Sequence, residues 1–219
     1  MTRAELARML DHSVLKPEST LADVHAGIDV VRLWHVGCYC VQPCRVRVSA
    51  EALAGTGAVV ASVVGFPHGA HRMDVKASEA ALAIDDGARE IDMVVDLGAL
   101  RDGDAARVAA DIEAVVRACG EVPVEAIIEA SALDEAHKRL ACRLAREAGA
   151  AFVKTSTGFH ASGGATVADV RLMRGEVGSA LGVKASGGIR TLADALAMIE
   201  AGASRIGTSA SAAILGAIA

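Results

Sequence analysis

Short apolar runs alternate with longer amphipathic segments along the chain, and this alternation limits the possible folds more than any other feature. Eight runs have the length and apolar content of β-strands: Leu10–Leu15, Cys38–Gln42, Val59–Val64, Glu90–Val95, Val122–Ile128, Ala151–Lys154, Gly182–Ala185 and Arg205–Thr208. Strands that alternate with helices pair in parallel, so eight repeats in 219 residues predict a closed (β/α)8 barrel, a TIM barrel. An open doubly wound sheet remains the alternative.

The segments between these runs have helical periodicity and helix-end signals. One apolar face consists of Leu21, Val24, Ile28 and Val31, and another of Val108, Ile112, Val115, Val116 and Cys119. Thr191, and either Ser19 or Thr20, stand at N-cap positions. Helix ends are marked by Gly37, Gly87, Gly120, Gly149 and Gly202. An extra short helix is predicted over Arg3–Met9, and without a Pro- or Ser-rich linker we expect one domain, residues 1–219.

Composition narrows the class of protein. Hydrophobic residues make up 53% of the chain and aromatic residues only 2%, so we expect an aliphatic core. No run approaches the roughly 18 apolar residues of a membrane span, and the N-terminus lacks a signal-peptide pattern. We therefore expect a cytoplasmic protein without a membrane partner. A net charge of −5, with no basic run, also argues against a nucleic-acid partner.

Cysteine and histidine positions do not predict a metal site. The odd count of five cysteines argues against a disulfide framework and indicates reduced thiols. A local cluster is formed by Cys38, Cys40 and Cys44, and a loop pair by His68 and His71, but no second ligand pair completes a zinc set. We expect no metal and no other cofactor.

Two lysines interrupt apolar strand-like runs, Lys154 at the end of Ala151–Lys154 and Lys184 within Gly182–Ala185. A buried ammonium group is costly unless it is paired or neutral, so such a lysine usually takes part in chemistry. On neighbouring strands the two groups would lower each other's pKa, and a free amine near neutral pH attacks carbonyl groups. The residues alone do not indicate which lysine is the nucleophile.

Carboxylates occur where they can act together with these lysines. Asp92 and Val94 share one face of the run Glu90–Val95, which places Asp92 inside the predicted barrel. There Asp92 can shuttle protons, or it can form a purely structural ion pair with Lys184. Carboxylates at other strand ends, which can serve either the site or the scaffold, are Asp11, Asp96 and Glu129.

Two glycine-containing turns, Ser186–Arg190 and Ile206–Ser209, follow the seventh and eighth runs. At this place (β/α)8 enzymes commonly hold a phosphate group on backbone N–H groups. Glycine permits close approach of the backbone, Ser209 adds a hydroxyl group, and Arg190 adds a positive charge. The two successive turns therefore predict a phosphate site.

With these motifs in place, the chain resembles the 2-deoxyribose-5-phosphate aldolases, a family of class I, metal-independent lyases. The resemblance is carried by the segments Leu10–Pro17, Cys40–Pro43, Val64–Gly69, Glu90–Val94, Gly98–Leu100, Val153–Phe159 and Val183–Thr191. It implies reversible cleavage of 2-deoxy-D-ribose 5-phosphate to D-glyceraldehyde 3-phosphate and acetaldehyde, in deoxynucleoside catabolism. It also implies that the partners are these small molecules and a second copy of the chain in a homodimer.

The resemblance further implies roles for individual residues. Lys154 would form the Schiff base, Lys184 would lower the pKa of Lys154 and assist proton transfer, and Asp92 would donate or accept protons through water. The phosphate would be bound by Gly158, Gly187, Gly188, Arg190, Gly207 and Ser209.

Two features depart from the pattern of many relatives, which have Asn at the position of Asp96 and a C-terminal tail ending in tyrosine. The sole tyrosine here is Tyr39, so we expect no proton transfer from such a tail. Two other functions remain open: another Schiff-base aldolase or transaldolase on the same barrel, and a non-catalytic phosphosugar-binding barrel. The presence of both lysines and Asp92 argues against a mere binding protein.

Overall fold

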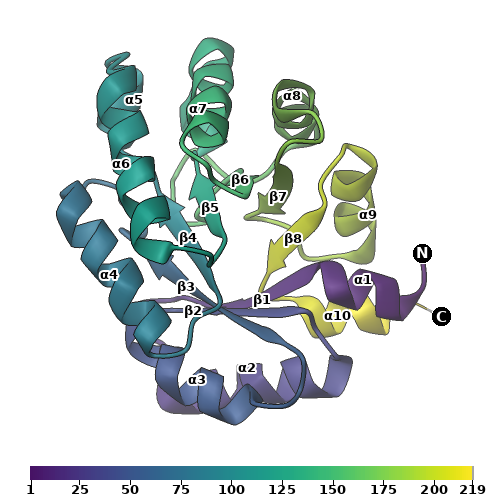
Figure 1. Ribbon diagram of the computed structural model, residues 1–219. Coiled ribbons are helices and arrows are strands. Elements are labelled where there is room, and N and C mark those ends of the chain that lie inside the picture. Colours follow the sequence, from purple (N-terminus) through teal and green to yellow (C-terminus); the bar gives the residue numbers. More distant parts are fainter. Residues whose placement is uncertain (219) are drawn as a thin grey trace.

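A closed barrel of eight parallel strands forms the centre of the computed structural model, which describes residues 1–218. The strands are β1 (Leu10–Val14), β2 (Cys38–Val41), β3 (Val59–Val64), β4 (Glu90–Val94), β5 (Val124–Ile127), β6 (Phe152–Lys154), β7 (Gly182–Ser186) and β8 (Arg205–Thr208). Neighbours pair in chain order, and pairing of β8 with β1 closes the barrel (Figure 1). The predicted (β/α)8 barrel is confirmed, and the open sheet is wrong.

Helices surround the barrel on its outside (Figure 1). They are α1 (Arg3–Met9), α2 (Leu21–Trp34), α3 (Val46–Leu53), α4 (Met73–Asp85), α5 (Leu97–Arg101), α6 (Ala105–Cys119), α7 (Glu135–Glu147), α8 (Val167–Val177), α9 (Leu192–Glu200) and α10 (Ser211–Gly216), with 3-10 turns at Pro43–Arg45 and Ala130–Ala132. The extra helix before β1 has the predicted bounds. Within residues 1–218, none of these helices has both the length and the apolar character needed to cross a bilayer.

Most helix ends follow the signals in the sequence. Thr20 and Thr191 cap α2 and α9, each in a capping box with an acidic residue three positions later. The backbones of Gly87, Gly120, Gly149 and Gly202 all have positive φ at or just after a helix end. Gly37 is the exception, because His35 caps α2 in the left-handed conformation. At Gly37 a Cβ atom would lie 2.5 Å from the Arg8 carbonyl oxygen, so this glycine lets α1 approach β2.

Some strand bounds differ from the prediction by one or two residues. β5 begins at Val124 and not at Val122, because Pro123 has no N–H to donate to a neighbouring strand. The predicted runs at β1, β2 and β4 each extend one residue too far, whereas β7 continues to Ser186. These shifts leave Lys154 and Lys184 within their strands.

The core has two parts of different chemistry. Between the strands and the helices lies a continuous layer of aliphatic residues, as the composition predicted. Inside the barrel, a small apolar cluster from β2 and β3 comprises Cys38, Cys40, Ala61 and Val63. Charged residues occupy the interior beside this cluster. A barrel interior is usually packed with branched apolar side chains, so this charged half is the feature that requires explanation.

Candidate active site

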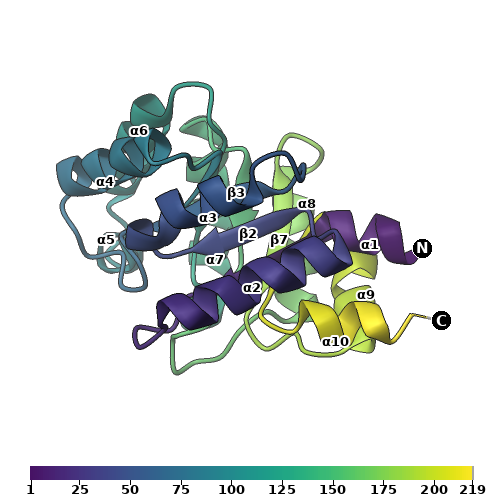
Figure 2. The same ribbon diagram turned by 90° about the horizontal axis from the view of Figure 1, so that it is seen from below.

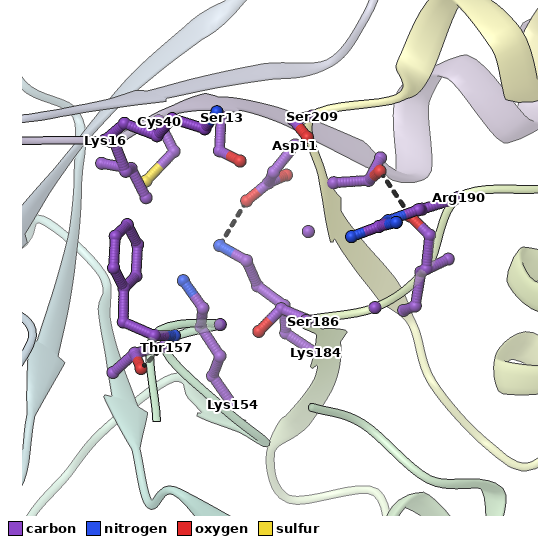
Figure 3. A pocket seen from close by; sticks show the side chains of 18 residues that line it. Asp11, Ser13, Lys16, Cys40, Lys154, Thr157, Lys184, Ser186, Arg190 and Ser209 are labelled. Carbon is purple, nitrogen blue, oxygen red and sulfur yellow. Dashed lines mark hydrogen bonds and ion pairs between the residues drawn. The ribbon is translucent and has the colours of Figure 1, made fainter. Parts of the chain in front are cut away.

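The two lysines lie side by side in the barrel interior. Lys154 on β6 and Lys184 on β7 are direct register partners, as expected for neighbouring strands. Only 4% of Lys154 and 0% of Lys184 is exposed, and both side chains point into the same cavity (Figure 3). The strand register therefore brings two amines together in a water-poor site.

Asp92 on β4 connects both amines. Its Oδ2 atom accepts hydrogen bonds from Lys154 Nζ at 2.6 Å and from Lys184 Nζ at 2.9 Å. Asp92 is fully buried and is not one of the residues that line the cavity. Although burial alone would raise the pKa of the Asp92 carboxyl group, the two ammonium groups lower it well below its usual range.

The pKa of Lys154 departs from the expectation. Burial is the largest single influence and lowers this pKa, and the neighbouring Lys184 ammonium lowers it further, but Asp92 together with Cys40 and Glu125 raises it by more. The pKa of Lys154 consequently lies above its ordinary value, and the expectation of a net lowering is wrong. The contribution of Lys184 has the expected direction. Asp92, in direct contact with Lys154 Nζ, is the largest influence that stabilises the Lys154 proton.

Further charged residues extend this network, and the sequence interpretation missed three of them. Lys184 Nζ contacts Glu125 Oε2 at 2.5 Å and also pairs with Asp11. Arg205 donates to Glu125 Oε1 at 2.9 Å and also to Glu90. The sequence could have predicted the place of Glu90 and Glu125, because side chains two apart on a strand share a face and each glutamate lies two residues from an inward-facing position. The sequence interpretation did not expect a charged residue near the start of a strand to face the barrel interior.

A cavity of about 250 Å³ opens at the carboxyl ends of the strands, above the two lysines. All six predicted phosphate-binding residues line it: Gly158, Gly187, Gly188, Arg190, Gly207 and Ser209. Arg190 and Ser209 lie across the cavity from Lys154 (Figure 3). The fold thus brings these residues together with the amines, while their binding of phosphate stays a prediction.

The turn after β7 depends on its glycines. Gly187 and Gly188 have φ values of 86° and 83°, which only glycine adopts without strain. A Cβ atom at Gly187 would lie 2.9 Å from Gly164 Cα in the loop after β6. Two loops therefore approach each other closely at this edge of the cavity.

Other residues also line the cavity wall. They are Ser13, Leu15, Lys16, Cys40, Thr157, Phe159, Ser186, Ile189 and Thr208, together with Asp11. The ring of Phe159 packs edge-on against Phe66, with 5.3 Å between the ring centres. Burial raises the pKa of the Cys40 thiol, so this group stays protonated beside the amines.

The three strand-end carboxylates have different roles. Asp11 pairs with Lys184 and belongs to the site. Asp96 caps α5 through the backbone N–H of Ala99 and pairs with Arg107 at 2.9 Å, so it serves the scaffold. Glu129 is buried, and its carboxylate accepts from both the backbone N–H and the hydroxyl group of Thr157, which fixes a residue of the cavity wall.

All five cysteines are free thiols, in agreement with the expected absence of a disulfide framework. Two buried groups of potential metal ligands occur within the described residues: Asp11 with Cys38 and Glu90, and Glu90 with Asp92 and Glu125. Lys184 and Arg205 form ion pairs with these same carboxylates. Protein cations thus already occupy positions among the potential ligands.

A barrel with interior amines beneath a cavity at its carboxyl face has the architecture of an aldolase, and comparison with known proteins agrees. The family model described as DeoC/LacD family aldolase matches residues 3–217. The chain belongs to this family of aldolases.

Individual relatives of this chain have names that are more specific than the family description. The chain is 56% identical over 212 residues to "Deoxyribose-phosphate aldolase" of Rhodospirillum rubrum, covering 97% of this chain and 89% of the relative. It is 54% identical over 218 residues to the protein of the same name from Mycobacterium avium, with 98% and 97% coverage. The solved structure of deoxyribose phosphate aldolase from Aeropyrum pernix, described as tetrameric, superposes with a TM-score of 0.91 at 30% identity, covering 98% of this chain and 91% of that chain.

Proposed function

We propose that the protein is a deoxyribose-phosphate aldolase that uses Lys154 as a Schiff-base nucleophile. In this reaction 2-deoxy-D-ribose 5-phosphate is cleaved reversibly to D-glyceraldehyde 3-phosphate and acetaldehyde. The observation that carries the proposal is the buried Lys154 amine, which faces the cavity and contacts Asp92 at 2.6 Å. The names of the relatives support this substrate.

The first step makes Lys154 nucleophilic. Transfer of one proton from Lys154 Nζ to Asp92 over 2.6 Å leaves a neutral amine. This amine adds to the C1 aldehyde of the open-chain sugar to give a carbinolamine. Protonation and loss of the carbinolamine hydroxyl group as water then gives a cationic iminium.

The iminium is the electron sink for cleavage. A base removes the proton of the 3-hydroxyl group, the C2–C3 bond breaks, and its electron pair moves into the iminium to form an enamine. Glyceraldehyde 3-phosphate leaves, the enamine is protonated at C2, and hydrolysis releases acetaldehyde. We assign these proton transfers to Asp92, acting through water beside the Lys184 charge. The iminium supplies the positive charge that a metal would supply in other aldolases, so the mechanism needs no metal.

The opposite wall of the cavity would hold the phosphate. The Gly187–Gly188 turn permits close approach of the backbone, and Arg190 and Ser209 provide a positive charge and a hydroxyl group (Figure 3). Binding at this wall would fix the distance between the phosphate end and the C1 aldehyde. The geometry favours a substrate with an aldehyde at one end and a phosphate at the other.

We further propose that residues 1–219 act as one cytoplasmic catalytic domain and that two copies form a homodimer. The closed barrel that spans the described chain supports a single domain. The description of the Aeropyrum pernix relative as tetrameric supports association of this kind of barrel with copies of itself.

Reductive trapping tests the nucleophile. Incubation with acetaldehyde and borohydride should convert the imine to N-ethyl-lysine at Lys154, measured by peptide mass spectrometry on the segment Phe152–Phe159, with or without chelator. Lys154→Ala should abolish both the adduct and the cleavage of deoxyribose 5-phosphate. As a control, Lys138→Ala on α7 should retain both, because Lys138 pairs with Asp169 away from the cavity.

Other outcomes would contradict the proposal. Labelling of Lys184 with Lys154 unmodified would reverse the assignment, and cleavage without any labelled lysine would exclude the Schiff base. Trapping at Lys154 without cleavage of deoxyribose 5-phosphate would favour another Schiff-base aldolase or a transaldolase, which a screen of aldehyde donors would identify.

A further inference from the structure

Glu129 is a buried carboxylate without an ion pair. It lies just after β5 and is 1% exposed. The other buried acidic side chains all pair with a lysine or an arginine: Asp11, Glu90, Asp92, Asp111, Glu125 and Asp169. Within residues 1–218 the Glu129 carboxylate forms hydrogen bonds only with Thr157. A buried carboxylate is costly unless its hydrogen bonds compensate, so this contact requires a reason.

The backbone of Glu129 is also unusual. Its φ of 50° lies in the left-handed region, and among the described residues other than glycine only His35 shares this conformation. His35 is an exposed residue at the C-cap of α2, where the left-handed conformation commonly occurs. Glu129 is buried, and no helix ends there. Backbone strain of this kind persists only where the surrounding contacts impose it, and it is concentrated at functional sites.

The neighbours of Glu129 bind the strand that carries the nucleophile. The Ile128 N–H donates to the Lys154 carbonyl oxygen at 3.0 Å, and the Ala130 N–H donates to the Thr155 carbonyl oxygen at 2.7 Å. These bonds extend the pairing of β5 with β6 beyond the ends of both strands. Glu129 therefore lies beside the segment that follows Lys154 in the chain.

The contact with Glu129 fixes the direction of the Thr157 hydroxyl group. The Thr157 N–H donates to Oε1 at 3.2 Å, and the hydroxyl group donates its only hydrogen to Oε2 at 2.6 Å. An ionised carboxylate can only accept, and this length is typical of an O–H···O⁻ hydrogen bond. Thr157 Oγ1 also accepts from the Phe159 N–H at 3.0 Å. With its hydrogen occupied, the hydroxyl group can offer only a lone pair to a further group.

Thr157 belongs to the wall of the cavity above the lysines. It lines the cavity together with Gly158 and Phe159. It lies on the same side as Lys154, across the cavity from Arg190 (Figure 3). A sugar that is bound through C1 to Lys154 and through its phosphate near Arg190 would carry its hydroxyl groups along this wall.

We propose that Glu129 is a positioning residue that acts through Thr157. It takes the hydrogen of the Thr157 hydroxyl group and so makes Thr157 Oγ1 a hydrogen-bond acceptor for a hydroxyl group of the sugar. It also holds the wall segment Thr157–Phe159 in place before the substrate arrives, which reduces the entropy lost on binding. This inference rests on the proposed function, which supplies the sugar and its attachment to Lys154.

Glu129→Gln tests this role, because glutamine has nearly the shape of glutamate but carries hydrogens on one arm. With its oxygen facing the Thr157 N–H, its Nε2 atom would donate to Thr157 Oγ1, so the contact persists while the hydroxyl hydrogen is released. The kcat/KM for deoxyribose 5-phosphate should fall about tenfold, mainly through KM, because the contact with the sugar forms on binding. Borohydride trapping of acetaldehyde, which has no hydroxyl group, should proceed at Lys154 within about threefold of the wild-type rate.

Variants of Thr157 locate the effect at its hydroxyl group. Thr157→Val should also raise KM for deoxyribose 5-phosphate, and Thr157→Ser, which keeps a hydroxyl group, should raise it less. Because Glu129 acts through this hydroxyl group, adding Glu129→Gln to Thr157→Val should lower kcat/KM by no more than about twofold further. Losses that multiply in the double variant would mean that Glu129 acts by another route, and they would overturn the proposal.

Asp23→Asn is the matched control. Asp23 Oδ2 accepts from both the backbone N–H and the hydroxyl group of Thr20, each at 2.7 Å, but this pair caps α2 and does not line the cavity. The kcat/KM of Asp23→Asn should stay within about twofold of wild type. Loss of an acceptor from a carboxylate–threonine pair is thereby tested outside the site.

Three results would overturn the role of Glu129. One is wild-type kcat and KM in a folded Glu129→Gln protein, and another is wild-type KM in Thr157→Val, whether or not Glu129→Gln folds. The third is an equal loss of cleavage and of trapping in Glu129→Gln, since Glu129 would then support the amine itself. Absence of trapping in the wild type would instead reject the Schiff-base mechanism, so the two failures are distinguishable.

Discussion

Burial alone does not separate a reactive lysine from a structural one. Lys76 on α4 is as completely buried as Lys184, but it lies outside the barrel and donates to Asp111 and to the Val94 carbonyl oxygen. Among the three buried lysines, Lys154 combines contact with the cavity and a single carboxylate partner that can take its proton. Lys154 is the candidate nucleophile because it lines the cavity and contacts a proton acceptor, and not because it is buried.

A buried histidine should make the protein sensitive to mild acid. His12 on β1 is 6% exposed and contacts Ser211 Oγ through Nδ1, and burial lowers its pKa to about 4 from 6.5. Between these values the unfolded chain binds a proton that the folded protein does not, so stability falls as pH falls. From pH 7 to pH 5, the free energy of unfolding should fall by about 2 kcal/mol more in the wild type than in His12→Asn.

Urea denaturation at the two pH values measures this difference. Asparagine keeps an amide group near the position of Nδ1 but does not titrate, and contributions from carboxylates cancel in the comparison. Equal losses of stability in both proteins would mean that His12 titrates with an ordinary pKa in the folded state.

At the scale of elements, the turn between β7 and α9 is the part of the fold on which the phosphate proposal depends. The turn starts at the strand that carries Lys184 and ends at Thr191, whose hydroxyl group accepts from the Asp194 N–H, while Asp194 accepts from the Arg190 and Thr191 N–H groups. The helix cap therefore fixes one end of the turn and the barrel fixes the other. Substrate binding should be sensitive to side chains placed between them.

Gly188→Val should impair binding of the phosphorylated substrate. Gly188 lines the cavity, so a side chain there would block close approach of a phosphate group. We expect KM to rise by about tenfold or more for deoxyribose 5-phosphate and much less for free deoxyribose. Steady-state kinetics with both substrates measures the difference.

Gly103→Val is a suitable control for the backbone effect of that change. Gly103 has a φ of 74°, close to the 83° of Gly188, but it lies between α5 and α6, away from the cavity. Gly103→Val should lose about as much stability as Gly188→Val, but its KM for deoxyribose 5-phosphate should not change. Equal increases in KM for both substrates in Gly188→Val would argue against a phosphate site at this turn.

For the whole molecule, closure of the barrel brings the two ends of the described chain together. α1 packs against α10, and these two ends lie near each other (Figure 2). Arg3 donates to the Ile218 carbonyl oxygen. Leu6 on α1 is 0% exposed and belongs to the continuous aliphatic core. The first helix is therefore part of the cooperative fold and is not an appendage.

Leu6→Ala should lower the free energy of unfolding of the whole barrel by about 3 kcal/mol, because it leaves a cavity in a packed core. Urea denaturation monitored by circular dichroism and by loss of acetaldehyde trapping should give coincident transitions. Leu33→Ala is the control, since Leu33 is 74% exposed and its loss should change stability little. A separate early transition for α1 in Leu6→Ala would contradict a single cooperative unit.

Local patterns in the sequence were sufficient for the elements of the fold. Apolar runs of four to seven residues, such as Val59–Val64, predicted the strands. Thr20 and Thr191 marked helix starts, and the repeated alternation predicted the barrel. These signals depend on residues close together in the chain, so they can be recognised without tertiary structure. The motifs around Lys154 and Lys184 predicted the family for the same reason.

Closure of the barrel and the strand register determined which distant residues become partners, and the sequence did not predict these pairs. Glu125 and Arg205 are separated by 80 positions, yet they form an ion pair at 2.9 Å because β5 and β8 face the same closed interior. The net pKa of Lys154 likewise depends on Asp92, which is 62 positions away. Electrostatic interactions depend on distance in space and on exclusion of water, and both are set only when the barrel closes. The sequence thus determined the barrel and its reactive residue types, whereas the tertiary structure determined their partners and their charges.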